Sequence, residues 1–163
     1  MKPVAIRGRN AARCLRAAAE LELRSGALYA RLAGRKGVPG WLADLLLGMA
    51  REEEQHAMRI RLLERLVQAD AWPEHAVVRI DEDLREAGSV LARLEAELEA
   101  PGPISLPAVL HALVAVERTF DALHAEMLAS TVSPPVAELF ETLRAQDAQH
   151  RELVRDARER RPG

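Results

Sequence analysis

Four breaks rich in glycine and proline divide the chain of 163 residues into long segments with helical periodicity. The breaks lie at residues 34–40, at residue 73, at residues 101–103 and at residues 134–135. Between them, apolar residues recur at steps of three and four, which place side chains on one face of a helix, and no stretch alternates as a β-strand does. We therefore predict an all-α fold with helices over residues 10–34, 39–69, 82–100, 106–130 and 134–160.

The lengths of the connections predict how these helices are arranged. Short loops follow residues 34 and 130, and helices joined by short loops lie antiparallel to each other. By contrast, about 35 residues separate residue 69 from residue 106. The prediction is an antiparallel four-helix bundle with one long crossover that carries the 82–100 helix as an extra element. That helix either covers its own bundle or reaches a partner subunit. Asp81, Ser105 and Ser133 are the expected N-terminal caps, and residues 1–163 are expected to form one domain.

Composition agrees with a globular helical protein and excludes several function classes. Apolar residues make up 48% of the chain and charged residues 29%, and the net charge of −2 gives no reason to expect nucleic acid or an anionic membrane as a partner. No signal peptide or membrane-spanning run is apparent, so a cytoplasmic location is expected. Cys14 is the single cysteine, which excludes an internal disulfide and a cysteine-based metal site; we expect it to be a small buried residue.

Acidic residues and histidines interrupt the apolar faces of the four long predicted helices. The inward positions are Glu22 on the first helix, Glu53 and His56 on the second, Glu117 and His124 on the helix after the crossover, and Asp147 and His150 on the last. An ionised carboxylate on a core face is costly unless it is paired or binds metal. Four such acids are all negative, and the two histidines that follow an acid by three residues, His56 and His150, would not neutralise them. Two divalent cations are therefore the predicted source of positive charge.

These residues form two copies of one pattern, an acid on one helix and acid-x-x-His on the next. In the first copy the acids are 31 residues apart and the histidine follows three later (Glu22, Glu53, His56). In the second copy the spacings are 30 and three (Glu117, Asp147, His150). A step of three lets a carboxylate and an imidazole on one helix reach the same pair of metal ions.

With this pattern the chain resembles the ferritin-like di-iron carboxylate superfamily, in which two helices supply Glu and two supply Glu-x-x-His. It is most similar to the rubrerythrin-like branch, through the stretch Glu-Glu-Glu-Gln-His-Ala at residues 52–57 and through Tyr29, two turns after Glu22. The resemblance covers the four long helices. It implies two iron ions, with manganese or a mixed pair as alternatives. It also implies the ligand roles: Glu53 and Asp147 as bridges, Glu22 and Glu117 as terminal ligands, and His56 and His150 on one ion each.

Three features depart from the family pattern. Asp147 stands where Glu is usual, and its side chain is one methylene shorter. Phe120 occupies the position three after Glu117, so the seventh carboxylate of rubrerythrins is missing there. The chain has no cysteine-rich rubredoxin module, so electrons would come from a donor that the sequence does not identify.

Several neighbouring residues have expected roles beside the metals. Tyr29 and His124 are the candidate catalytic residues. Tyr29 is expected to be a core residue that hydrogen-bonds near the site, and His124 is an outer partner, an extra ligand or a buried core histidine. Asp121 is a candidate partner for the outer nitrogen of a metal-bound histidine. The remaining expectations are that Glu52 and Glu54 are solvated, that Glu22 rather than Glu20 points inward, that His75 and His111 are structural or exposed, and that Trp41 and Trp72 pack at helix ends.

The predicted function is that of a dinuclear, non-haem di-iron oxidoreductase. It would reduce peroxide or O₂ while its iron cycles between Fe(II) and Fe(III), and a homodimer is expected. Two alternatives remain open: an iron storage or buffering protein that uses the same ligands, and a metal-free helical interaction protein with a degenerate site.

Overall fold

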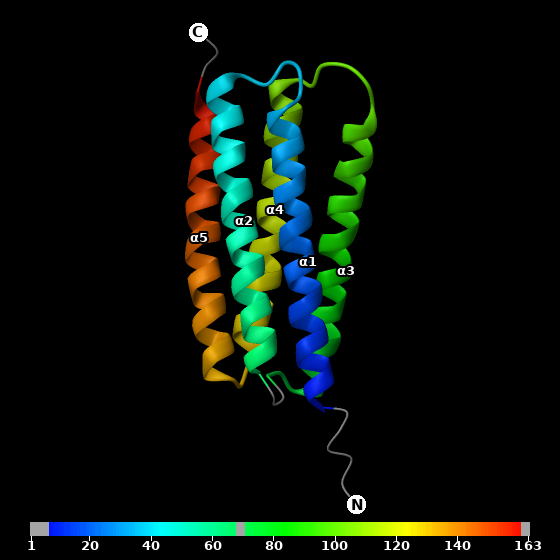
Figure 1. Cartoon of the computed structure of the whole chain (residues 1–163), viewed down its shortest axis with the longest axis vertical. Helices are drawn as coiled ribbons and strands as arrows, with labels where there is room; N and C mark the ends of the chain where they lie inside the picture. The colour runs from blue at the N-terminus through cyan, green and yellow to red at the C-terminus, as the bar shows by residue number, and fades with distance from the viewer. Residues whose placement is uncertain (1–6, 68–70, 161–163) are drawn as a thin grey trace, which may run out of the picture.

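Five helices lie side by side along the long axis of the molecule (Figure 1). The structure is a computed structural model and describes residues 7–67 and 71–160. The helices are α1 (Arg7–Ala33), α2 (Gly40–Leu66), α3 (Glu74–Glu99), α4 (Leu106–Ser130) and α5 (Pro134–Glu159). No strand forms within these residues, so the prediction of an all-α fold is confirmed.

The bounds of the four long helices agree closely with those predicted. Ser105 caps α4, because its side chain accepts a hydrogen bond from the backbone N–H of Ala108 at 3.3 Å. Ser133 occupies the N-cap position of α5, but its side chain makes no capping bond. Helix α2 ends at Leu66, and Ala69, the predicted end, lies outside the described residues.

The start of α3 was predicted wrongly. The helix begins at Glu74, after Pro73, rather than at residue 82, because its apolar face already starts with the buried residues Val77 and Ile80. Asp81 is therefore an internal residue and not a cap. Its carboxylate instead forms two hydrogen bonds with the guanidinium of Arg13 on α1, at 2.8 and 2.7 Å.

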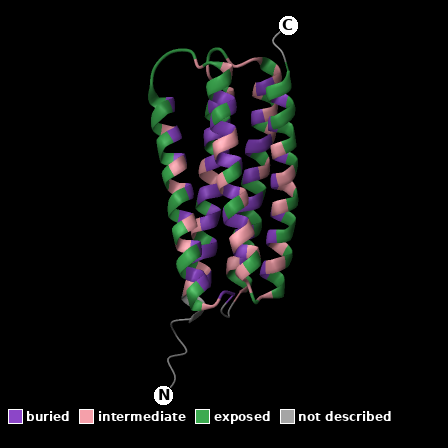
Figure 2. Cartoon of the chain, turned by 180° about the vertical axis from the view of Figure 1, so that it is seen from behind, coloured by how far each residue is buried: buried purple, intermediate pink, exposed green. Residues whose placement is uncertain are grey.

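Helix α3 packs on α1 and α4 of its own chain, at the side of the bundle away from α5 (Figure 1). Its inward face is a row of buried residues: Ala76, Val77, Ile80, Leu84, Ala87, Leu91, Leu94 and Leu98. The opposite face is largely exposed (Figure 2). The extra helix thus covers its own bundle, which the sequence had left undecided.

The loops at both ends of the bundle are fixed by specific contacts. The backbone N–H of Ile104 donates to the carbonyl of Lys36 at 3.0 Å, beside Gly37. Gly37 has a φ of 98°, and a Cβ there would lie 2.7 Å from the Ile104 carbonyl oxygen, so the turn requires glycine. At the other end, the buried indole N–H of Trp72 donates to the Met127 carbonyl at 2.8 Å.

The other single residues noted in the sequence lie as follows. Cys14 is buried as expected, and burial raises its pKa to about 11. Trp41 is half-buried under the guanidinium of Arg160, 4.9 Å from the ring centroid. No helix within the described ranges is long and apolar enough to cross a membrane.

Candidate metal centre

The four helices α1, α2, α4 and α5 bring all the predicted inward acids and histidines into one buried cluster. Its members are Glu22, Glu53, His56, Glu117, His124, Asp147 and His150. None is more than 4% exposed. The apolar stripe of each helix turns these residues inward, because they sit in register with core residues such as Met49 and Ile60 on α2. Glu20 is exposed and pairs with Arg61, so Glu22 is the inward acid of α1, as expected.

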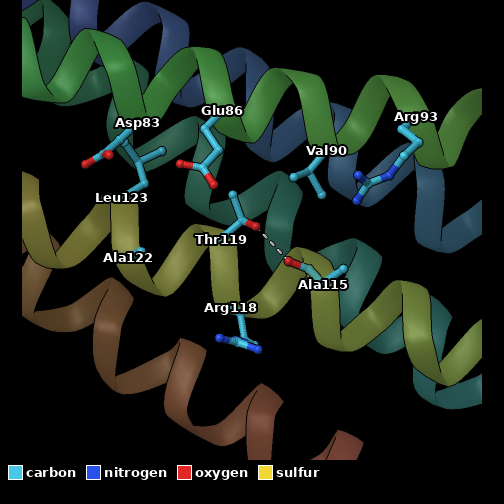
Figure 3. A pocket seen from close by; sticks show the side chains of 9 residues that line it. All are labelled: Asp83, Glu86, Val90, Arg93, Ala115, Arg118, Thr119, Ala122 and Leu123. Carbon is cyan, nitrogen blue, oxygen red and sulfur yellow. Dashed lines mark hydrogen bonds between the residues drawn. The ribbon is translucent and has the colours of Figure 1, made fainter.

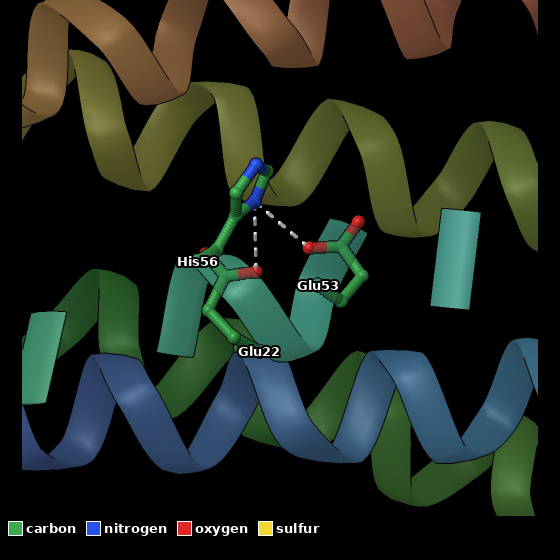
Figure 4. A group of neighbouring side chains, drawn as sticks. All are labelled: Glu22, Glu53 and His56. Carbon is green, nitrogen blue, oxygen red and sulfur yellow. Dashed lines mark hydrogen bonds and ion pairs between the residues drawn. The ribbon is translucent and has the colours of Figure 1, made fainter. Parts of the chain in front are cut away.

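Glu22, Glu53 and His56 form the first group that could hold a metal ion. Nδ1 of His56 lies 3.1 Å from Oε2 of Glu53 and 3.6 Å from Oε2 of Glu22. Figure 4 shows the two carboxylates converging on this nitrogen, one from α1 and the other from the same helix as the histidine. The arrangement offers two carboxylates and one imidazole to a single point.

Glu53, Glu117 and His150 form the second group. Nδ1 of His150 lies 3.3 Å from Oε1 of Glu53 and 3.5 Å from Oε2 of Glu117. Glu53 therefore belongs to both groups, with Oε2 toward His56 and Oε1 toward His150. The two imidazole rings lie roughly parallel, with their centroids 6.1 Å apart. A carboxylate shared in this way is suited to bridging two cations.

Asp147 belongs to neither group and is paired with His124. Oδ2 of Asp147 lies 2.7 Å from Nδ1 of His124, and Nε2 of the same ring lies 2.9 Å from Oε1 of Glu22 in ion-pair contact. Phe120, at the position of the missing seventh carboxylate, packs edge-on against this ring with a centroid distance of 6.0 Å. His124 thus links the first acid of one half-site to the aspartate of the other.

Glu52 supplies a contact that the sequence analysis missed. Its Oε2 lies 2.7 Å from Nε2 of His150, the ring nitrogen that faces away from the second group. The Glu52 side chain is 42% exposed, so it is only partly solvated. The contact between Glu52 and His150 joins α2 to α5 across the bundle, and no spacing within one helix indicates it.

Asp121 was the predicted partner of a metal-bound histidine. It lies instead 2.9 Å from Arg151, and that prediction was wrong.

Tyr29 and the remaining predicted residues are placed as expected. The Tyr29 hydroxyl is fully buried and donates to Oε1 of Glu117 at 2.6 Å. Burial, followed by the charge of Glu117, raises the pKa of Tyr29 well above its usual value, so the phenol keeps its proton. Glu54, His75 and His111 are exposed.

The negative charge of the buried acids is balanced by more groups than the two histidines considered from the sequence, because His124 also pairs with two of the acids. Burial raises the pKa of Glu53, and the charge of Glu22 raises it further. Burial also opposes ionisation of Glu22, yet contacts with Glu53, His124 and His56 lower its pKa to about 2. Three imidazolium ions balance three of the four carboxylates, and the raised pKa of Glu53 lowers the cost of the remaining one. Burial of four acids therefore does not by itself require metal.

The histidines hold their protons strongly in the absence of metal. Burial lowers the pKa of His56, but Glu22 and Glu53 outweigh burial and raise it to about 10. Burial also lowers the pKa of His150, but Glu117 and Glu53 outweigh it and raise this pKa to about 11. Burial lowers the pKa of His124 as well, and Asp147 and Glu22 raise it to about 10. The protons on His56 and His150 are the ones that ligation would displace.

The donor atoms of each group are nevertheless placed so that they could hold a metal ion. Within each group, one ligand atom from every residue lies within 4.8 Å of the others. Oε2 of Glu22, Nε2 of His56 and Nδ1 of His150 are buried without a hydrogen-bond partner among the described residues. Unsatisfied buried carboxylate oxygens and imidazole nitrogens are what a cation would complete.

Comparison with known proteins adds no assignment: no family model, curated protein or solved structure matches the chain.

Proposed function

We propose that this chain is a ferritin-like, rubrerythrin-like protein with a dinuclear metal centre, and that it is an oxidoreductase for peroxide or O₂. The observation that supports the proposal best is the position of Glu53, shared by two Glu/Glu/His groups through its two oxygens. If the cluster served only to neutralise buried charge, one cationic partner for each acid would be enough. Contact of one carboxylate with two imidazoles would not be required.

Five residues would hold the ions: Glu22 and His56 one, Glu117 and His150 the other, and Glu53 both. Carboxylate oxygen and imidazole nitrogen without thiolate suit iron or manganese. When bound, a diferrous pair supplies two electrons, one from each ion, for reduction of H₂O₂ or O₂.

The other residues of the cluster would orient the ligands and hold protons. His124 keeps Glu22 and Asp147 in fixed positions, which leaves Asp147 beside the centre with its carboxylate already paired. Tyr29 holds a proton on its hydroxyl at 2.6 Å from Glu117. Glu52 orients the ring of His150 from outside. Burial of every ligand excludes bulk water from the reacting centre.

Metal analysis with matched variants tests this proposal. Purified protein loaded anaerobically with Fe(II) is expected to contain about two ions per chain. Each of the two groups would hold one ion, and Glu53 would serve both. The double variant Glu53→Ala/His150→Ala should lose most of this metal. The control Glu54→Ala/His111→Ala removes the same residue types from exposed positions and should retain it. Equal metal content in both variants would overturn the proposal. Rapid oxidation of the loaded centre by H₂O₂, with turnover when a reductant is supplied, tests the oxidoreductase assignment.

A second candidate, a metal-free helical protein, is favoured by one observation. Each of the four buried acids lies in ion-pair contact with at least one of three buried histidines, so much of their charge is offset without any ion. Thermal unfolding with and without saturating Fe(II) or Mn(II) distinguishes the two, because a ligand that binds only the folded state raises its stability. An unchanged melting temperature supports the metal-free protein.

A further inference from the structure

A small cavity between α4 and α5 reaches the second metal-ligand group. Its volume is about 170 Å³, and its lining includes Val114, Glu117 and Arg118 from α4 and Arg151, Val154 and Arg158 from α5. Glu117 and Val154 are each 3% exposed, so they form the floor, and Val114 adds an apolar wall. The larger cavity between α3 and α4, drawn in Figure 3, contains none of the candidate ligands.

Arginine side chains surround the mouth of this cavity. Arg151 is paired with Asp121 at 2.9 Å, and Arg155, which also lines the cavity, is paired with Glu152. Arg118 and Arg158 are exposed and form no ion pair with any residue that the structure describes. Figure 3 shows the guanidinium of Arg118 on the side of α4 that faces away from α3 and toward α5. Both arginines therefore line the same cavity, and neither has an acidic partner among the residues that the structure describes.

We propose that this cavity binds a small organic anion, a monocarboxylate with a short apolar chain, as the ligand or substrate of the metal centre. The carboxylate would pair with Arg118 and Arg158, because guanidinium groups form strong charge-assisted bonds with carboxylates. The chain would lie on Val114 and Val154. The space allows roughly six heavy atoms, since a water-sized group occupies about 30 Å³, so a chain of about five carbons fits inside while the carboxylate lies at the mouth.

Glu117 fixes the orientation of such a ligand. Its carboxylate at the floor repels a second carboxylate and leaves the rim arginines as the anionic subsite. The apolar end of the ligand would then be the part nearest to Glu117 and the second metal position. The substrate role rests on the proposed metal centre, whereas anion binding itself needs only the cavity and its arginines.

Calorimetric titration with hexanoate tests the proposal on the metal-free and the Mn(II)-loaded protein. Hexanoate should bind the parent protein, and hexanol, which has the same chain without the charge, should bind at least about tenfold more weakly. The double variant Arg118→Ala/Arg158→Ala should lose binding by a similar factor. Arg31→Ala/Arg65→Ala is the matched control, because both are exposed arginines that do not line the cavity. Val154→Trp should abolish binding by filling the cavity without removing a charge.

The outcomes separate this proposal from the metal proposal. The arginine variants should bind as much Mn(II) as the parent, since neither arginine is a ligand. Failure of hexanoate to bind a protein that holds two metal ions overturns the cavity proposal alone. Hexanoate affinity equal to the parent's in the Arg118/Arg158 variant, or an equal loss in the Arg31/Arg65 variant, also overturns it. If the protein takes up no metal and hexanoate still binds through these arginines, the anion site is supported. Its role as a substrate site is then overturned.

Discussion

Asp147 is paired with His124 at 2.7 Å, and both side chains are buried. The same imidazole lies 2.9 Å from Glu22, so one histidine serves two carboxylates from different half-sites. The shorter acid on α5 therefore has its own histidine partner, and Asp147 is absent from both groups that could hold a metal ion. The two halves of the sequence repeat are therefore unequal in space.

Removing His124 should be strongly destabilising. His124→Leu leaves Asp147 and Glu22 buried without their cation, and breaking a buried pair in this way costs about 3–5 kcal/mol. Urea unfolding of the metal-free variant measures the loss. His111→Leu, an exposed histidine on the same helix, is the control and should change stability by about 0.5 kcal/mol or less. A His124 variant as stable as this control would contradict the pairing.

Metal binding should release protons and weaken as the pH falls. In the metal-free protein the pKa of His56 is raised to about 10 and that of His150 to about 11, so both are protonated at neutral pH. Each must lose its proton to become a ligand, so about two protons per chain should leave at pH 7. Calorimetry of Mn(II) binding in buffers with different ionisation enthalpies counts them. Release of no protons would show that these histidines are not the ligands.

Glu52 should control affinity at the second metal position. Glu52→Gln replaces the carboxylate 2.7 Å from Nε2 of His150, and loss of such an outer partner typically weakens metal binding by about 10–100-fold. The neighbouring variant Glu54→Gln removes the same charge from an exposed position and should leave affinity unchanged. Competition with a chelator gives the stepwise affinities. Equal affinities in the two variants would argue against an orienting role for Glu52.

Gly26→Ala should carry a steric cost in stability, because Gly26 lies where α1 approaches α2 closely beside the candidate metal centre. A Cβ there would lie 3.1 Å from the Ala50 carbonyl oxygen and 3.3 Å from Cβ of Glu53, so α1 and α2 would have to separate. Gly48 has nothing within 4 Å of such a Cβ, and Gly48→Ala should stabilise α2 by about 1 kcal/mol through helix propensity. Gly26→Ala should gain less than this or lose stability in thermal unfolding. An equal gain at both positions would contradict the close approach.

The sequence by itself determined the secondary structure and the inward faces. Glycine and proline breaks and the apolar steps of three and four are local properties, and they predicted α1, α2, α4 and α5 closely. The same periodicity identified every acid and histidine of the buried cluster, because a helix fixes which side chains share a face. It gave the start of α3 incorrectly, since Asp81 has the chemistry of a cap but lies on the side of the helix that faces Arg13.

Only the tertiary structure decided which of these residues meet. Three contacts between helices define the cluster. Asp147 on α5 pairs with His124 on α4, and Glu52 on α2 contacts His150 on α5. Glu53 uses its two oxygens to take part in both groups. Such contacts depend on the axial offset and rotation of whole helices, which packing of the complete core sets and no spacing within one helix records. The packing of α3 on its own chain is of the same kind, because an apolar stripe specifies that a surface is buried and leaves open what buries it.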